Sequence, residues 1–521
     1  MSMKSWGTEL LPLATAATVL GALATGCQKE PPAEPAPTPT PLPEEGIPLR
    51  QLAIATASPA PSADKGRPML IPRPKEVQFR EGGVFKLGPE TPLVVLGALT
   101  PQEQRAVTAL QAAMTARFGQ PLKLSATALP NAIQLGGPRH PDTPQRPEGY
   151  LLRVLPDGVT LSASDARGLF WGVQTLLQLF VDKTELAAAS VRDWPTLPLR
   201  AVHLFHGNRA LPFHQKLIER IFAPLKLNAL FLEVEQVRWD ADPGVAPPWA
   251  GTPAQLREEI AFARERNLTV YPLLQSLGHM GWLLGQGTNS RFAEDPATPY
   301  ALCLNDPAAV RYVERFVAEA DALFQAPAFH VGLDEVSLKG RFPYRSRPTA
   351  APELFLKGVK HWRDFFAARG KPIYVWADMA LHAPEVKPAF GTAPSASQAA
   401  AIRAGIPRDV VIADWQYGEH ADFPSLRQLK GAGFQKLVAA SWYRPKNIQT
   451  LSRAAAQVGA QGLIQTTWCG YESSEDVLKT EEKRQFTAMV LAAEYFWNGG
   501  GPAPGELPFS PEAVFDQRWS A

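Results

Sequence analysis

The sequence has little of several features that would assign a protein to a class directly. Three cysteines in 521 residues do not make a disulfide framework. The formal net charge is only +2 and no long basic run occurs, so nucleic acid is not an expected partner. No His or Cys group has the spacing of a zinc motif, and no glycine-rich loop has the form that cradles phosphates. The glycines at 499–501 follow a predicted helix and are typical of a C-cap and turn. We therefore expect no metal and no cofactor.

The N-terminal segment has the pattern of an export signal. Lys4 precedes an apolar run, Leu10–Leu23, which is too short to cross a membrane as a helix. Small residues then lead to Cys27, which predicts a signal peptide over residues 1–27 and resembles a bacterial lipobox with Cys27 as the acylated residue. Gln28, not Asp, follows it, which does not favour retention at an inner membrane. We expect a lipid-anchored protein of the bacterial cell envelope, at the outer membrane or cell surface. The alternative is plain secretion after cleavage nearby.

Proline is abundant, at 51 residues, and much of it lies in residues 28–67 together with Ala, Thr and Glu. Such a segment has little to bury, so it predicts a disordered linker. From residue 68 the composition changes. Residues 150–154 and 158–162 have the composition of two strands, and the Pro-Asp-Gly turn between them predicts a β-hairpin. Residues 166–180 have the apolar spacing of an amphipathic helix. Residues 68–195 are thus predicted to form a small α+β accessory domain without chemistry of its own.

The remainder repeats a short apolar strand, a loop and a helix. Eight such units between residues 196 and 505 predict a (β/α)8 TIM barrel, followed by a C-terminal tail at 506–521. No internal sequence repeat fixes the count, so seven or nine units stay open. The predicted strands are residues 201–205, 229–233, 269–273, 328–332, 372–376, 410–414, 436–440 and 462–466.

Two adjacent carboxylates end one of these strands. Asp334 and Glu335 directly follow the apolar stretch 329–332. In a parallel α/β protein substrates bind where strands end, and buried acids are costly unless they have a use. The pair therefore indicates acid–base chemistry. The alternative is a charge pair at the N-terminus of a following helix.

Carboxylates and aromatic residues recur at the ends of the other predicted strands. Acids can move protons, while aromatic rings cover the apolar C–H face of a pyranose, so this mixture is typical of a sugar site. A single Trp is more often a core residue, but four at successive strand ends favour a site. The residues at or near these ends are Arg200, Glu233, Glu235, Gln275, His279, His330, Trp376, Asp378, Asp414, Trp415, Tyr417, Trp442, Tyr443, Trp468, Tyr471 and Glu472.

Three stretches resemble glycoside hydrolase family 20, the β-N-acetylhexosaminidases. Residues 149–180, GYLLRVLPDGVTLSASDARGLFWGVQTLLQLF, look like the family's accessory domain. LPLRAVHLFHG resembles its arginine-bearing first barrel strand, and FHVGLDEVS resembles its His-x-Gly-Gly-Asp-Glu motif, with Leu333 in place of the second glycine. The His and Asp that the family places near Glu233 and Gln236 are absent. The resemblance covers roughly residues 68–500 and indicates a divergent branch.

The resemblance implies hydrolysis of a terminal β-linked N-acetylhexosamine with retention of configuration. In this family the substrate's own acetamido oxygen attacks the anomeric carbon. By this reading Glu335 is the general acid and later the base, and Asp334 orients the acetamide and stabilises an oxazolinium intermediate. No metal is needed.

The same resemblance implies roles for the residues around this pair. Trp376, Trp415 and Trp468 would wall the pocket, and Tyr443 would bond the acetamide oxygen. Arg200 and Glu472 would hold sugar hydroxyls, His279 would support the acid, and His330 would tune it. An ion pair is the alternative for Arg200, and a hydrogen-bonded core residue for His330.

Several points stay open at this level. The partner is expected to be an N-acetylhexosamine-containing oligosaccharide or glycoconjugate, of gluco or galacto configuration. The rival is a non-catalytic, surface-anchored glycan-binding protein on the same fold. Cys303 and Cys469 could pair in an oxidising compartment, but the sequence does not bring them together.

Overall fold

The structure, a computed structural model, describes residues 67–521. The predicted signal peptide, the acylation site Cys27 and all but the last residue of the predicted linker lie outside the described residues. Within the described range no helix has both the length and the apolar character needed to cross a bilayer.

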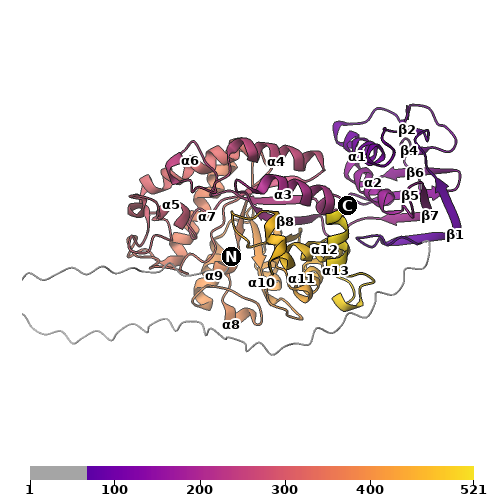
Figure 1. Ribbon diagram of the computed structural model, residues 1–521. Coiled ribbons are helices and arrows are strands. Elements are labelled where there is room, and N and C mark those ends of the chain that lie inside the picture. Colours follow the sequence, from indigo (N-terminus) through magenta and orange to yellow (C-terminus); the bar gives the residue numbers. More distant parts are fainter. Residues whose placement is uncertain (1–66) are drawn as a thin grey trace, which may run out of the picture. The chain divides into compact units, whose positions relative to one another are not determined.

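The first part is a seven-stranded mixed sheet with two helices (Figure 1). Its strand order is β1-β7-β5-β6-β4-β2-β3. The β5–β6 hairpin closes with Leu155 opposite Gly158, as the turn residues predict. The strands are β1 Glu76–Lys86, β2 Leu93–Leu96, β3 Leu124–Ser125, β4 Ile133–Gly136, β5 Tyr150–Leu155, β6 Gly158–Ala163 and β7 Glu185–Asp193. The helices are α1 Pro101–Phe118 and α2 Ala166–Gln178.

Helix α2 is buried on nearly all sides, from Gly168 to Leu176. A helix that is buried all round must have neighbours on opposite faces. One face packs on β5 and β6 of its own sheet. On the other side Gln178 donates to the carbonyl of Pro224, which lies in the second part of the chain. The accessory domain therefore packs against the barrel through α2.

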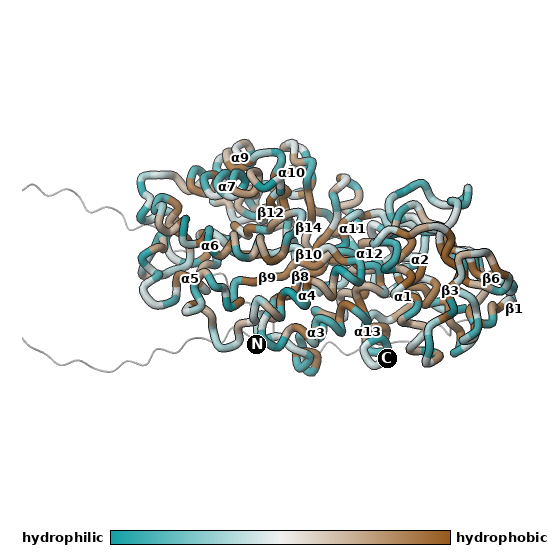
Figure 2. Tube along the Cα trace, turned by 90° about the horizontal axis from the view of Figure 1, so that it is seen from above, coloured by the Kyte–Doolittle hydropathy of each residue, from teal (hydrophilic) through white to brown (hydrophobic). Residues whose placement is uncertain are grey.

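The second part is a closed barrel of eight parallel strands in the order β8 to β15, each paired with the next and β15 with β8. This confirms the (β/α)8 prediction, and the predicted strands agree within about two residues at each end. In Figure 2 the labelled strands run brown through the middle of the barrel. The strands are β8 Leu199–Phe205, β9 Ala229–Glu233, β10 Thr269–Leu273, β11 Phe329–His330, β12 Ile373–Trp376, β13 Val411–Trp415, β14 Leu437–Ser441 and β15 Gly462–Gln465.

The helices that cover the barrel begin where the sequence provides caps. Thr252 accepts from the N–H of Gln255 while the Gln255 side chain accepts from the N–H of Thr252, so α4 starts with a capping box. Proline stands at the first position of α4, α6, α10, α11 and α13, where its missing N–H costs nothing. The helices are α3 Ala210–Leu217, α4 Pro253–Glu265, α5 Gly281–Leu284, α6 Pro307–Phe324, α7 Ala351–Ala367, α8 Ala383–Val386, α9 Ala396–Gly405, α10 Pro424–Gly431, α11 Pro445–Gln457, α12 Lys483–Asn498 and α13 Pro511–Ser520.

Two segments differ from the sequence-based expectation. The helix expected after the first barrel strand is α3 followed by a π-helical turn, Ile218–Phe222, rather than one continuous α-helix. The predicted tail at 506–521 contains α13, whose Phe515 is fully buried and whose Trp519 ring lies 5.7 Å from that of Phe213. The C-terminal segment is therefore part of the packed barrel.

Side chains that point inward fill the barrel. The rings of Phe231 and Tyr271 stack at 4.8 Å, and Tyr374 meets Phe231 edge-on at 5.3 Å. The His330 ring lies parallel to Tyr374 at 5.9 Å. The barrel is a packed core rather than a pore, and any site must lie at one of its ends.

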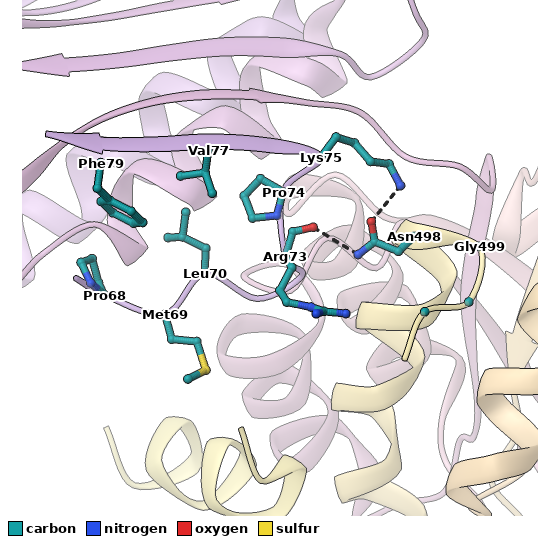
Figure 3. Close-up of a pocket in the computed structure, with 12 residues that line it drawn as sticks. Pro68, Met69, Leu70, Arg73, Pro74, Lys75, Val77, Phe79, Asn498 and Gly499 are labelled. Carbon is teal, nitrogen blue, oxygen red and sulfur yellow. Dashed lines mark hydrogen bonds between the residues drawn. The ribbon is translucent and has the colours of Figure 1, made fainter. Parts of the chain in front are cut away.

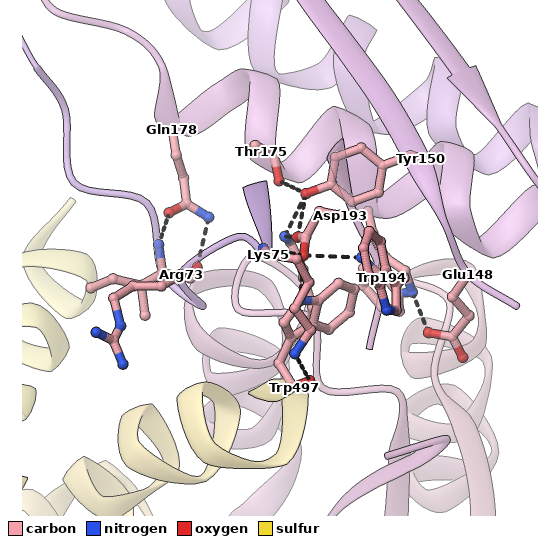
Figure 4. A network of polar contacts seen from close by, with 12 residues as sticks. Arg73, Lys75, Glu148, Tyr150, Thr175, Gln178, Asp193, Trp194 and Trp497 are labelled. Carbon is pink, nitrogen blue, oxygen red and sulfur yellow. Dashed lines mark hydrogen bonds and ion pairs between the residues drawn. The ribbon is translucent and has the colours of Figure 1, made fainter. Parts of the chain in front are cut away.

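Buried charges join the accessory domain to the amino ends of the barrel strands. Lys226, after the π-helical turn, lies 3.0 Å from the carboxylate of Asp193 in β7, and both side chains are fully enclosed. Asp193 also accepts from the Tyr150 hydroxyl at 2.7 Å and from the Trp497 indole at 2.9 Å (Figure 4). Each charged group has partners, as burial of charge requires.

Arg200 belongs to this junction, and its predicted role as a sugar ligand is corrected here. It is the second residue of β8 and therefore lies at the end of the barrel away from the strand carboxyl ends. Its fully buried guanidinium pairs with Glu148 of the accessory domain and donates to the carbonyls of Lys226 and Leu197. The ion-pair alternative is correct.

We expect Lys226→Met to lower the free energy of unfolding by about 3–5 kcal/mol, because it leaves Asp193 charged and buried without its cation. Urea denaturation of the purified protein measures this. The matched control is Lys479→Met, which removes an exposed pair with Asp476 and should leave the free energy of unfolding nearly unchanged. Adding Asp193→Asn to Lys226→Met should restore part of the loss. Equal effects of the two lysine changes would contradict the importance of this buried pair.

Candidate active site

The loop after β11 has an unusual backbone that positions the two acids. Gly332 has φ +71°, Leu333 φ +74° and Glu335 φ +46°, all in the left-handed region. For a residue with a side chain this conformation costs roughly 1–2 kcal/mol. Leu333 is fully buried, and that burial offsets the cost. No helix follows before α7 begins at Ala351, so the alternative of a helix N-terminal charge pair is wrong.

Gly332 is required because of the side chain that passes beside it. A Cβ on Gly332 would lie 1.8 Å from the Oε1 atom of Gln275. Gln275 follows β10, and its side chain helps to lower the pKa of Asp334 by hydrogen bonding. The glycine thus lets the loop after β10 approach the acid pair.

A cavity of about 270 Å³ opens at the carboxyl ends of the strands. Six of the predicted site residues line it, together with three strand-end residues to which no site role was given. The lining residues are Glu233, Gln275, His279, Asp334, Glu335, Trp376, Trp415, Tyr417 and Trp468.

His279 is the cation of this pocket. Its Nε2 atom lies 3.4 Å from Asp334 Oδ2 and 3.3 Å from Glu335 Oε2, without the alignment of a hydrogen bond to either. Burial alone would lower the pKa of His279, but the two carboxylates raise it to about 11. Burial would likewise raise the pKa of Asp334, and His279 brings it below its usual value. The arrangement therefore keeps Asp334 ionised beside an imidazolium.

Among the described residues, these three side chains also form a group that could hold a metal ion. Their ligand atoms lie within 4.8 Å of one another. A protonated His279 occupies the position of a cation between the two acids, so the charge balance of the pair needs no ion.

Asp378, after β12, fixes both the acid loop and one pocket wall. Its Oδ2 atom accepts from the N–H of Glu335 at 3.0 Å and from the Thr392 hydroxyl at 2.6 Å. Its Oδ1 atom accepts from the Trp415 indole at 3.3 Å. Burial, and then the charge of Asp334, raise the pKa of Asp378 to about 7. One carboxylate thus positions Glu335 and Trp415 relative to each other.

We expect Asp378→Asn to reduce kcat/KM of the activity proposed below by roughly 10- to 100-fold, because an amide cannot accept from all three donors and Glu335 shifts. Steady-state kinetics with an aryl glycoside test this. Asp422→Asn, at an exposed ion pair with Arg427, is the control and should leave kcat/KM within about twofold. An unchanged rate in Asp378→Asn would show that this network does not position the acid.

Aromatic rings form the rest of the wall. Trp415 lies 5.1 Å from Tyr417, and the Trp468 indole donates to the Tyr417 hydroxyl at 3.2 Å. Trp376 is almost fully buried, and its indole N–H has no partner among the described residues. The pocket therefore has a mainly apolar aromatic side from β12 to β15.

Glu233 lies on the opposite side, at the end of β9. Its Oε2 atom is 2.8 Å from His203 Nε2. Burial raises the pKa of Glu233 to about 8 and lowers that of His203 to about 4. Behind it, Glu235 accepts from the Tyr471 hydroxyl at 2.5 Å and from the N–H of Gln275 at 2.8 Å.

Three more predicted site residues do not line the pocket, in addition to Arg200. His330 is fully buried beneath it, 4.3 Å from the Trp376 ring, and burial lowers its pKa to about 3, so it is a neutral core residue. Tyr443 packs edge-on against Trp442 and beneath the guanidinium of Arg484. Glu472 is exposed. Their predicted substrate contacts are corrected accordingly.

Glu233, Gln275, Tyr417 and Asp378 stand at strand ends in the sequence, yet none was given a site role. The strand-end position was the available signal, because every lining residue lies at or just after the end of a barrel strand. Nothing local in the sequence distinguishes Glu233 from Glu235, of which only Glu233 lines the pocket.

A larger cavity, of about 540 Å³, lies beside β1 and the glycines after α12 (Figure 3). No carboxylate lines it, and its two cations are engaged. Lys75 bonds the Asn498 side chain at 2.8 Å, and Arg73 bonds Glu494 at 2.8 Å. This cavity therefore has no side chain that could act as a general acid or base.

Cys303 and Cys469 are both free thiols, so they do not pair.

Comparison with known proteins agrees with this architecture. Residues 67–194 match the family model described as glycosyl hydrolase family 20, domain 2. A β-hexosaminidase of Porphyromonas gingivalis is 27% identical over 250 residues, which cover 39% of this chain and 31% of that protein. A lacto-N-biosidase of Bifidobacterium bifidum is 23% identical over 357 residues, or 62% of this chain and 31% of that protein. The match thus spans about a third of the length of these curated relatives.

Solved structures show the same fold. The N-acetyl-β-hexosaminidase of Streptomyces plicatus has a TM-score of 0.66 and 20% identity, over 88% of this chain and 97% of that chain. The exo-β-N-acetylglucosaminidase of Vibrio harveyi, solved with N-acetylglucosamine, has a TM-score of 0.66 and 17% identity, over 87% and 77%.

Proposed function

Because the chain is a distant homologue of the glycosyl hydrolase family 20 β-hexosaminidases, we propose that it is an exo-acting glycosidase. It removes a terminal β-linked N-acetylhexosamine with retention of configuration. The observation that carries this proposal is the acid pair Asp334 and Glu335, which opens into an aromatic pocket beside the His279 imidazolium.

The pocket supports a reaction in which the substrate supplies the nucleophile. The acetamido oxygen attacks the anomeric carbon while Glu335 gives its proton to the glycosidic oxygen, and the leaving group departs as an alcohol. Asp334, ionised beside His279, accepts from the acetamide N–H and stabilises the positive oxazolinium ring. Glu335 then takes a proton from water, which attacks the same carbon and reopens the ring.

Adjacent acids suit this route better than a conventional double displacement. A retaining enzyme with a carboxylate nucleophile places its two carboxyl groups about 5–5.5 Å apart, on opposite sides of the anomeric carbon. Here both acids contact one imidazole nitrogen, at 3.4 and 3.3 Å. They lie on the same side of the pocket, which leaves the opposite face for the substrate's own oxygen.

The size of the pocket favours a single sugar. Its volume of about 270 Å³ lies just below the range of about 300–1,000 Å³ that is typical of ligand sites. Trp468 and Glu233 are among the residues that enclose it. This supports a monosaccharide-releasing hexosaminidase over a lacto-N-biosidase, which must hold a disaccharide.

A comparison of two substrates tests the proposal. Purified protein lacking residues 1–67 is assayed with the aryl β-glycosides of N-acetylglucosamine and of lacto-N-biose. We expect release of N-acetylglucosamine with retained configuration by proton NMR, and little release of lacto-N-biose. Tight binding of N-acetylglucosamine without turnover would replace the proposal with a glycan-binding protein.

We also propose that Cys27 carries a lipid that holds the protein at the bacterial cell envelope. The supporting observation is the pattern of small residues before this cysteine. Mass spectrometry of the mature N-terminal peptide tests it: an acylated Cys27 is expected, and an unmodified N-terminus would favour plain secretion.

A further inference from the structure

The mechanism above leaves one buried acid of the pocket without a role. Glu233 is the last residue of β9, lines the cavity and is 5% exposed. In the closed strand order β9 stands four strands from β13 in either direction, so Glu233 faces Trp415 across the barrel mouth. A sugar that turns its acetamido group to Asp334 and Trp415 presents its far edge to Glu233.

The partner of Glu233 determines which atoms it can offer. His203 Nδ1 lies 3.0 Å from the carbonyl oxygen of Thr467, which can only accept, so Nδ1 carries a proton. The second nitrogen, Nε2, lies 2.8 Å from Glu233 Oε2. One proton lies between Glu233 Oε2 and His203 Nε2. Glu233 therefore directs Oε2 to His203 and keeps Oε1 as an acceptor.

The remaining neighbours fix the carboxyl group and its charge. Glu235, beyond the end of β9, is held by Tyr471 and by the N–H of Gln275. A hydrogen bond from the Glu235 side chain and the charge of His279 favour a negative charge on Glu233, whereas Asp334 opposes one. His203 and Tyr471 complete the titratable groups that face it from β8 and the loop after β15. Burial is the largest influence, and it keeps Glu233 protonated and His203 neutral at neutral pH.

We propose that Glu233 is a specificity-determining residue that binds the 4- and 6-hydroxyl groups on the far edge of the terminal sugar. Its Oε1 atom accepts from these hydroxyls, and His203 is the positioning residue that holds its Oε2 atom. In a pyranose the 4-hydroxyl differs in orientation between the gluco and galacto sugars, so Glu233 also sets the preference between them. This inference rests on the proposed function.

The chain allows a matched pair of variants. In Glu233→Gln the amide N–H₂ donates to His203 Nε2 and the amide oxygen takes the place of Oε1, so the contact to the sugar is kept. In Glu233→Ala both contacts are lost. Wild type and both variants are assayed with the aryl N-acetyl-β-glucosaminide, its 4-deoxy and 6-deoxy analogues, and the galacto epimer.

Glu233→Ala is expected to lower kcat/KM for the full glucosaminide by at least about tenfold, the effect of one lost hydrogen bond in a buried site. The loss should shrink to within about threefold for the 4-deoxy and the 6-deoxy analogue, each of which lacks one of the two hydroxyls that Glu233 binds. Glu233→Gln should stay within about threefold of wild type for every substrate.

The outcomes separate the two proposals. If wild type hydrolyses the glucosaminide but Glu233→Ala loses the same factor with every substrate, Glu233 has only a structural role and this inference fails alone. Equal losses in Glu233→Gln and Glu233→Ala lead to the same conclusion. If wild type hydrolyses none of the glycosides, the proposed function itself fails.

Discussion

Replacing Glu335 with glutamine is expected to reduce kcat/KM for an aryl N-acetyl-β-glucosaminide by at least about 10²-fold, the low end for loss of a general acid. Glutamine keeps the size of the side chain but has no proton to give to the leaving oxygen. Glu335 is the more exposed of the two acids, and it lies beside His279 at the pocket mouth. The measurement is kcat/KM, which reports the first irreversible step.

The leaving group provides an internal control. A dinitrophenyl glycoside needs little protonation, so Glu335→Gln should lose much less with it than with a methylumbelliferyl or alkyl glycoside. Glu472→Gln is the control variant, because Glu472 is exposed and lies outside the pocket. A near wild-type rate in Glu335→Gln, or a loss independent of the leaving group, would reject Glu335 as the acid.

Replacing Asp334 with alanine is expected to reduce kcat by about 10²–10³-fold, the usual effect of removing one charge-stabilising group from a transition state. Asp334 is the more buried acid, and its pKa stays low against the effect of burial because His279 lies 3.4 Å away. It therefore offers a negative charge where the oxazolinium ring would form.

Inhibitor binding distinguishes this role from simple loss of structure. A thiazoline that mimics the oxazolinium ring should bind wild type tightly and the Asp334→Ala variant at least about 10²-fold more weakly, while N-acetylglucosamine loses far less. A thermal unfolding midpoint close to that of wild type shows that the variant is folded. Equal losses for the mimic and the sugar would contradict a role for Asp334 in stabilising the intermediate.

The barrel and the acid pair were accessible from sequence because they depend on local pattern. Each predicted strand is an apolar run between polar loops, and each lies within about two residues of its observed bounds. Asp334 and Glu335 follow such a run directly. In a parallel barrel the end of a strand also gives its place in space, so six predicted site residues share one pocket.

The predictions for Arg200 and His330 were wrong because they did not take into account where along a barrel strand each residue stands and where its side chain points. Arg200 is the second residue of β8 and so lies at the opposite end of the barrel, where it forms an ion pair with Glu148. Glu148 is 52 residues away in another domain, and no sequence pattern pairs the two. His330 is the last residue of β11, but its side chain points into the packed barrel interior beneath Trp376.

Asp378 and Glu233 were given no site role, because their functions depend on contacts between segments that are far apart in the sequence. Asp378 acquires its function from Glu335, Thr392 and Trp415, which come from three separate segments of the chain. Burial keeps Glu233 protonated, and its Oε2 atom contacts His203 of the neighbouring strand β8. Such contacts are tertiary, so periodicity and motif spacing do not predict them.

The central claim is that the substrate's acetamido oxygen is the nucleophile, and a series of N-acyl substrates tests it most directly. Aryl glucosaminides with N-acetyl, N-fluoroacetyl, N-difluoroacetyl and N-trifluoroacetyl groups differ mainly in the electron density on that oxygen. The account predicts that kcat/KM falls steeply with each added fluorine. A rate that stays constant across the series, with a covalent sugar–enzyme adduct detected by mass spectrometry, would contradict it.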